Sequence, residues 1–339
     1  MYWKMAIIFV LLFLLFTPAL SQIAIEWEML PASDGDNLTY PFDKTSVATN
    51  DYKISLGIPL VLASKKEDTT KVPTLVLSNA LFYSNKHLIV EKWPNYQDSV
   101  FNLKDTYDHL VSFGYSATLT KTLNKYWSIL GIAGFTYAGF SPDKYRLKDI
   151  GINGGIAGVK KWDSGWTLGF GLYYGRLTGV DALMPIIIVQ KKTEHTILNI
   201  SLPSAMSYWY IFNNKINFGL TAEINGDMYI EPGAKVAQYD KNGQLKSTKN
   251  NIGLAYSAVT IGPALKYSIM DGVSIIARTG LSFARRYQYW IPEEEEVLRW
   301  PDIGDPGWMD LTGHDYTGED VEFPMKSNFF FKLTVGVGI

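Results

Sequence analysis

The segment from Asn328 to Ile339 alternates between two kinds of side chain, and this pattern limits the folds open to the chain. The apolar set is Phe329, Phe331, Leu333, Val335, Val337 and Ile339, and the set between them is Asn328, Lys332, Thr334, Gly336 and Gly338. Successive side chains of a strand point to opposite faces, so the segment predicts a strand with one apolar and one polar face. A tilted strand of about ten residues can cross a bilayer, but the edge strand of a soluble β-sandwich alternates in the same way.

Similar segments recur along the chain in pairs joined by short turns. The clearest pairs are 111–119 with 126–140, 150–162 with 166–177, and 252–267 with 273–288. Short turns, such as those at Asn124 and Asp163, alternate with longer connections, such as those beginning at Glu231 and Pro292. Outer-membrane barrels have short periplasmic turns and long extracellular loops. We therefore predict an all-β fold, an antiparallel transmembrane β-barrel of about 12 to 14 strands, with a secreted array of β-sandwiches as the alternative.

Aromatic residues support the membrane interpretation. The chain has 21 Tyr and 10 Trp, and such amphipathic rings are typical of membrane interfaces. One group lies beside short turns and comprises Tyr126, Trp127, Trp162, Trp166 and Tyr267. A second group lies where a strand enters a long connection and comprises Tyr287, Tyr289 and Trp290. The pattern predicts two aromatic girdles, one at each membrane interface.

The amino-terminal residues are typical of an exported protein. Lys4 precedes an apolar run from Ala6 to Phe16, and small residues follow at Ala19 and Ser21. We expect residues 1–21 to be a signal peptide cleaved after Ser21, and the mature protein to lie in the cell outer membrane. Residues 22–50 show no sustained periodicity and are interpreted as an N-terminal periplasmic extension. The barrel is then expected over residues 51–339, closed by pairing of the last strand with a strand beginning near Tyr52.

Composition excludes several classes of function. The 31 Lys and Arg residues balance the 33 Asp and Glu residues, so no nucleic-acid partner is expected. Cysteine is absent, which excludes disulfides, cysteine metal sites and a cysteine nucleophile. The expected partners are outer-membrane lipid and lipopolysaccharide, the barrel insertion machinery and, inside the barrel, a small solute.

Charged residues on polar strand faces are the candidate site. A polar face such as that of Glu223 and Asp227 would not suit a sandwich core, but it suits a barrel lumen. The lumen-facing candidates are Glu223, Asp227, Lys266, Arg278, Arg286 and Lys332. We expect Lys332 to face acids such as Glu223 across the interior. These charges could form an eyelet that selects small solutes, or an ion-paired interior that plugs the barrel.

The residues give little sign of catalysis. None of the four histidines has a serine and an acid at predictable neighbouring wall positions, as a membrane hydrolase requires. His109 is expected to face outward near a strand end, and His314 lies in a long acidic connection. The acidic run Glu293 to Glu296 lacks the ligand spacing of a calcium loop and is interpreted as a solvated external loop. We expect no catalytic residues, no cofactor and no metal site.

Three blocks of residues resemble a known family. They are Gly-Ile-Ala-Gly-Val-Lys-Lys-Trp at 155–162, Asn-Ile-Ser-Leu-Pro at 199–203, and Tyr208 with Tyr210. Together with the signal peptide, they resemble an uncharacterised family of outer-membrane β-barrel proteins from Gram-negative bacteria, catalogued as a domain of unknown function. The resemblance covers Asp51 to Ile339 and implies no substrate or catalytic residue. Outer-membrane barrels usually finish on an aromatic residue, whereas this chain finishes on Ile339.

Three functions follow from these observations. The leading hypothesis is a porin-like channel or binder for small hydrophilic solutes, because the inward faces are polar. The alternative is a structural or surface-interaction barrel with a plugged interior that acts through its external loops. An outer-membrane hydrolase is the third hypothesis.

Overall fold

The fold was analysed in a computed structural model of the 339-residue chain. The structure describes residues 22–35, 46–63, 75–91, 109–139, 150–176, 181–239, 245–290 and 321–338. The predicted signal peptide, residues 1–21, and the acidic run Glu293 to Glu296 lie outside these residues. Within them, no helix has the length and apolar character needed to cross a membrane.

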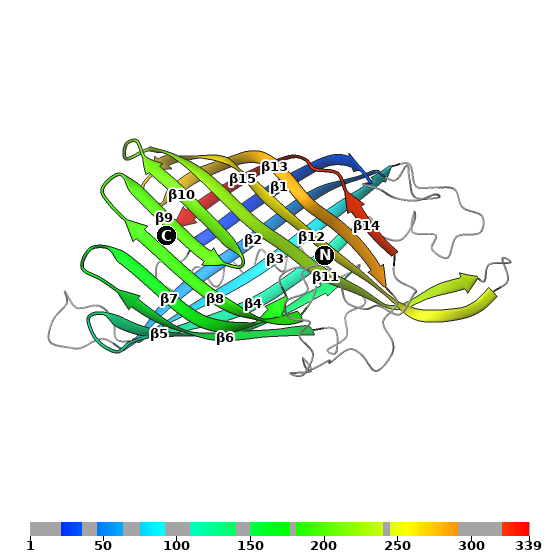
Figure 1. Ribbon diagram of the computed structural model, residues 1–339, viewed down its shortest axis with the longest axis horizontal. Helices are drawn as coiled ribbons and strands as arrows, with labels where there is room; N and C mark the ends of the chain where they lie inside the picture. The colour runs from blue at the N-terminus through cyan, green and yellow to red at the C-terminus, as the bar shows by residue number, and fades with distance from the viewer. Residues whose placement is uncertain are drawn as a thin grey trace.

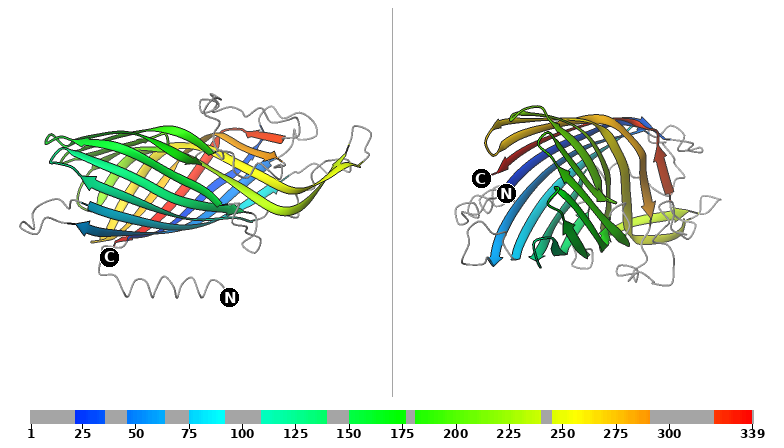
Figure 2. Two further views of the ribbon diagram at one scale, coloured as in Figure 1. Left: turned by 90° about the horizontal axis from the view of Figure 1, so that it is seen from below. Right: turned by 60° about the vertical axis from the view of Figure 1, so that its left-hand side comes forward.

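The described residues form one antiparallel sheet that closes on itself (Figures 1 and 2). Its strands are β1 (Gln22–Asp34), β2 (Ser46–Ala63), β3 (Leu75–Glu91), β4 (His109–Thr122), β5 (Trp127–Gly139), β6 (Ile150–Lys161), β7 (Trp166–Arg176), β8 (Asp181–Lys192), β9 (Thr196–Leu202), β10 (Ala205–Ile211), β11 (Ile216–Tyr239), β12 (Leu245–Met270), β13 (Val273–Trp290), β14 (Val321–Met325) and β15 (Asn328–Gly338). Both β14 and β15 pair with β13, so together they occupy one position. The result is a 14-stranded closed barrel, as the alternating pattern predicted.

The amino-terminal segment corrects one prediction. Residues 22–34 are not a periplasmic extension but the strand β1, which pairs with β15 on one side and with β2 on the other. The last strand therefore closes the barrel against β1 and not against the strand containing Tyr52. Ile23, Ile25 and Trp27 already alternate with Ala24 and Glu26, so a strand signal was present. Ser46 also begins β2 earlier than expected.

The two faces of the barrel differ as a transmembrane barrel requires. Phe170, Ile152 and Phe212 are 68%, 65% and 64% exposed, and each lies on the outer face. Glycines occupy many inward positions, and at Gly171 an added Cβ atom would clash with the Ile156 carbonyl oxygen and with Ala157 on β6. Neighbouring strands can thus approach closely there. Because the sheet has no free edge, its backbone groups are paired without water, and the apolar face can contact lipid.

The connections at the two ends differ in length. Short turns join β4 to β5, β6 to β7, β8 to β9, β10 to β11 and β12 to β13 at one end, hereafter the short-turn end. In the β4–β5 turn, the side-chain oxygen of Asn124 accepts hydrogen bonds from the backbone N–H groups of Tyr126 and Trp127, at 2.9 and 3.0 Å. Asn213 accepts the same pair of bonds in the β10–β11 turn. Asparagine favours such turns because its side chain mimics a backbone carbonyl.

The connection predicted to begin at Glu231 is instead a long hairpin. β11 continues to Tyr239 and β12 begins at Leu245, so both strands extend beyond the rest of the barrel, as the yellow ribbon in Figure 1 shows. We interpreted this segment as a loop because its composition is polar, but a hairpin that extends beyond the barrel needs no apolar face.

The barrel narrows at the end opposite the short turns. Beyond the ends of β6 to β10, β11 meets β5 in a parallel contact between Ile230 and Gly139. On the other side, Met325 of β14 forms a bridge to Gly35, which follows β1. Strands β1 to β5 and β11 to β14 therefore form a smaller circuit of nine strands within the described residues. We call this part of the barrel the neck. An eight-stranded barrel is just filled by its side chains, so a neck of this size has little open space.

Candidate functional site in the barrel lumen

An ion-paired cluster centres on Glu223, a lumen-facing residue of β11. Its carboxylate accepts hydrogen bonds from Arg278 of β13 and, at 3.1 Å, from Lys332 of β15. The Lys332 Nζ atom also lies 3.1 Å from Glu26 and 3.7 Å from Glu28, both on β1. Side chains of these four strands thus meet in the lumen. Lys332 and Glu223, both predicted to face the lumen, form an ion pair.

A second cluster lies on β3 and centres on Lys86. Its Nζ atom lies 3.7 Å from Asp51 of β2 and 3.8 Å from Asp227 of β11. The same ammonium group lies 4.1 Å from the ring centroid of Tyr256. Tyr229 donates a 3.0 Å hydrogen bond to Asp227. Lys86 is only 4% exposed, so its charge is held by these acids and rings and not by water.

The two clusters form one continuous arrangement, because Glu28 and Asp51 are register partners on adjacent strands. It begins on β11 at Glu223, follows β13, β15, β1, β2 and β3, and returns to β11 at Asp227. We call these eight residues the charged belt: Glu26, Glu28, Asp51, Lys86, Glu223, Asp227, Arg278 and Lys332. Five are acidic and three are basic, so the formal charge is negative and water or a cation is favoured over an anion.

A β-bulge lies on β13 between the belt and the neck, and it moves the side chains that follow it to the opposite face of the strand. The pairing of β12 with β13 shifts between Ser257 and Val259, and opposite this shift Ala284 has a positive φ of 50°. An extra residue in one strand moves every later side chain to the other face. Arg285 therefore points into the barrel and Arg286 does not. The prediction that Arg286 faces the lumen is wrong for this reason.

Arg285 is fully buried in the neck. Its guanidinium donates hydrogen bonds to the carbonyl oxygens of Pro31 and Val47, at 3.1 and 2.8 Å. It also donates to the hydroxyl groups of Thr49, at 3.0 Å, and Tyr287, at 2.8 Å. Tyr287 is 2% exposed, so it belongs to this interior and not to the predicted outer girdle. One arginine thus links β13 to β1 and β2 across the neck.

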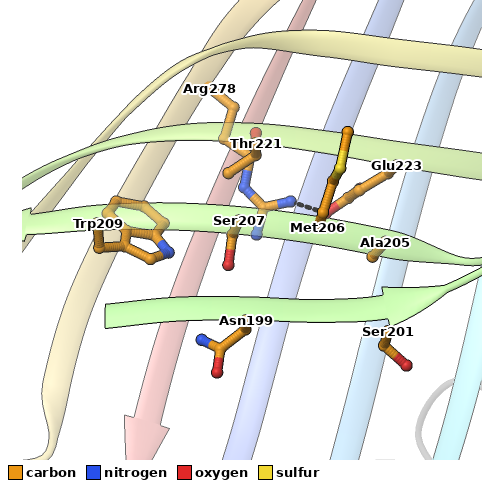
Figure 3. Close-up of a pocket in the computed structure, with 9 residues that line it drawn as sticks. All are labelled: Asn199, Ser201, Ala205, Met206, Ser207, Trp209, Thr221, Glu223 and Arg278. Atoms are coloured by element: carbon orange, nitrogen blue, oxygen red, sulfur yellow. Dashed lines mark hydrogen bonds and ion pairs between the residues drawn. The ribbon is translucent and has the colours of Figure 1, made fainter. Parts of the chain in front are cut away.

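A pocket of about 150 Å³ lies beside the belt on the wall formed by β9, β10, β11 and β13 (Figure 3). Neutral polar groups line it: Asn199, Ser201, Ser207 and Thr221. The Glu223–Arg278 ion pair, the Trp209 ring, Ala205 and Met206 complete the lining. A Cβ atom on Gly219 would meet the Trp209 ring, so the ring lies against the β11 backbone at this glycine. The Nε atom of Arg278 is buried and has no hydrogen-bond partner among the described residues.

The structure brings together four of the six predicted lumen charges, namely Glu223, Asp227, Arg278 and Lys332. Lys266 also faces the lumen by register, but it lies near the β12–β13 turn and outside the belt. Glu26, Glu28, Asp51 and Lys86 were missed, and the first two lie in the segment that was interpreted as an extension. The alternation of Glu26 and Glu28 with apolar neighbours could have identified the first two.

The histidines within the described residues lie away from the belt. His87 and His109 stack on each other with ring centroids 4.8 Å apart, at paired positions of β3 and β4. His195 lies in the β8–β9 turn. Among the described residues, no group of three or more metal-ligating side chains is placed to hold an ion.

A closed antiparallel sheet with an apolar outer face and a polar lumen defines an outer-membrane β-barrel protein. Residues 17–291 match the family described as "Domain of unknown function (DUF6268)", and the chain belongs to this family. The resemblance to an uncharacterised outer-membrane barrel family is thereby confirmed.

Comparison with solved structures gives three examples of similar chains. The COG4313 outer membrane channel from Pseudomonas putida F1 is 10% identical with a TM-score of 0.42, and the match covers 95% of this chain and 97% of that chain. The P. putida toluene transporter TodX is 8% identical with a TM-score of 0.38, covering 96% and 91%. The translocator domain of the autotransporter NalP from Neisseria meningitidis is 10% identical with a TM-score of 0.35, covering 95% and 88%. Comparison with curated protein sequences gave no match.

Proposed function

We propose that the protein binds a small hydrophilic solute inside the barrel and controls its passage across the outer membrane. The observation that carries the proposal is the polar pocket beside the Glu223–Arg278 ion pair. Its amide and hydroxyl groups offer both donors and acceptors, and its volume of about 150 Å³ limits the solute to a small molecule. The unpartnered Arg278 Nε atom is a further donor for such a ligand.

The proposal predicts that filling the pocket blocks the solute. Ser207 points into the lumen, and Leu220 on the paired strand β11 has its side chain on the lipid face. Ser207→Trp should therefore slow the swelling of proteoliposomes in isotonic solutions of small uncharged polyols several-fold. Leu220→Trp adds a similar ring on the outside and should leave the swelling rate unchanged.

Two results would contradict this proposal. One is equal swelling rates for the Ser207→Trp variant and the parent protein. The other is folded parent protein that gives neither swelling nor single-channel conductance in a planar bilayer. Folding is checked by the slower migration of unfolded, heated samples compared with unheated samples on a denaturing gel.

A second candidate is a surface-interaction barrel whose interior is plugged. It is favoured by the belt, which crosses the lumen from β3 to β11, and by the filled neck. Replacing residues 233–250 with an Asn-Gly turn would shorten the β11–β12 hairpin and leave the Pro232–Asn251 pair in place. Loss of a cell-surface phenotype in this variant, with a non-conducting parent protein, would support the second candidate. An unchanged phenotype would remove it.

A further inference from the structure

The outer face at the short-turn end of β4 to β8 carries a row of alternating lysine and tryptophan side chains. Lys121 on β4, Lys160 on β6 and Lys191 on β8 occupy the same face as the exposed apolar residues of their strands. Trp127 on β5 pairs in register with Lys160, and Trp166 on β7 pairs with Lys191. We call Lys121, Lys160 and Lys191 the lysine row.

Tryptophan rings hold two of these ammonium groups at a fixed height. The Nζ atom of Lys160 lies 5.4 Å from the ring centroid of Trp127 and 4.9 Å from that of Trp162. The Nζ atom of Lys191 lies 5.0 Å from the Trp166 ring and donates a 2.6 Å hydrogen bond to the Ser164 carbonyl. Tryptophan rings settle at the headgroup level of a bilayer, so the charges they hold are at phosphate depth.

The short-turn end of β4 to β9, hereafter the rim, is strongly basic. The ends of β4 to β9 and their turns carry six lysines, which are Lys121, Lys125, Lys160, Lys161, Lys191 and Lys192, but only two acids, Asp163 and Glu194. Asp163 is already bound by Lys125 at 2.8 Å. That hydrogen bond lowers the pKa of the Asp163 carboxyl, so the acid is charged and already paired with Lys125. Within the described residues, no member of the lysine row forms an ion pair.

We propose that the lysine row binds the phosphate groups of anionic phospholipids in the leaflet at the short-turn end of the barrel. The row stands at the edge of the apolar outer face, where lipid headgroups meet the protein, and its charge is complementary to theirs. With the expected orientation, this leaflet is the periplasmic one. The inference concerns the outside of the barrel and does not depend on a solute in the lumen.

The test compares lipid binding by two variants with the same change of charge. The first replaces Lys121, Lys160 and Lys191 with Gln, and the control replaces Lys161, Lys192 and Lys215 with Gln. The control lysines are exposed at the same rim, but Lys161 and Lys192 occupy strand positions of opposite parity to the row, and Lys215 lies in the β10–β11 turn. Each detergent-purified protein is titrated with phosphatidylglycerol or phosphatidylcholine, and bound lipid is counted by native mass spectrometry.

We expect the row variant to lose roughly tenfold in affinity for phosphatidylglycerol, with phosphatidylcholine binding unchanged. The control variant should lose less than about twofold, because its lysines do not lie on the lipid-facing side. Equal losses in the two variants would mean that only the net charge of the rim matters, and would overturn the proposal. Retention of parent affinity by the row variant would also overturn it. Heat-modifiable gel migration shows that each variant remains folded.

Discussion

Arg285 and Arg286 show how one inserted residue separates two neighbouring arginines. Arg285 is 1% exposed and donates to carbonyl and hydroxyl groups on β1, β2 and β13. Arg286 lies on the opposite face. The two positions therefore suit a paired mutagenesis experiment. Both are arginines on β13, but their side chains lie in different surroundings.

Replacing Arg285 with Ala should lower the free energy of unfolding by about 3 kcal/mol, since the bonded carbonyl and hydroxyl groups would stay buried without a donor. Arg286→Ala should cost less than about 1 kcal/mol. Urea titration of the proteins in lipid vesicles measures both. Similar losses at the two positions would contradict the buried role of Arg285.

The same pair shows what strand alternation can and cannot predict about the direction of a side chain. Strict alternation placed Glu223, Asp227, Arg278 and Lys332 on the lumen face, because regular strands preserve parity over their length. It failed at Arg286 because the bulge occurs at Ala284, and alanine carries no signal for a positive φ. Glycine is the usual residue in that conformation.

At the element scale, β1 determines whether the barrel closes. It was interpreted as an extension because Pro31 and Asp34 lie in its second half and Gly35 and Asp36 follow directly. Its pairs with both β15 and β2 make it a central strand, and its Glu26 and Glu28 side chains complete the belt. A polar inward face weakens the hydrophobic signal of a strand, so short barrel strands are the hardest elements to predict.

A proline within β1 should prevent closure. Ile25 pairs with Val335 on one side and Ile54 on the other, so Ile25→Pro would remove a ladder donor from a central strand. We expect loss of the heat-modifiable form on a denaturing gel. Glu194→Pro in the exposed β8–β9 turn is the matched control and should fold normally, because proline suits the second position of a turn. A folded Ile25→Pro protein would show that β1 is dispensable.

At the scale of the whole molecule, the neck and the pocket divide the interior into two regions. Asn199 lines the pocket in the wide region, whereas the lumen-facing Leu110 is completely buried near the neck. Because the chain has no cysteine, single cysteines introduced at these positions report on access without background.

Asn199→Cys in lipid vesicles should react with a charged, membrane-impermeant thiol reagent, whereas Leu110→Cys should not. Phe170→Cys, on the lipid-facing surface, controls for reagent that crosses the bilayer and should also remain unmodified. The extent of modification is measured by mass spectrometry. Rapid modification of Leu110→Cys would show that the neck is open to water.

Within the described residues, the neck is held by the parallel pair Ile230–Gly139, the Gly35–Met325 bridge and the side-chain contacts of Lys86 and Arg285. None of these contacts belongs to the antiparallel ladder that closes all 14 strands. Breaking these contacts is a local opening, which costs less free energy than unfolding the wall. The neck can therefore widen while the barrel stays folded.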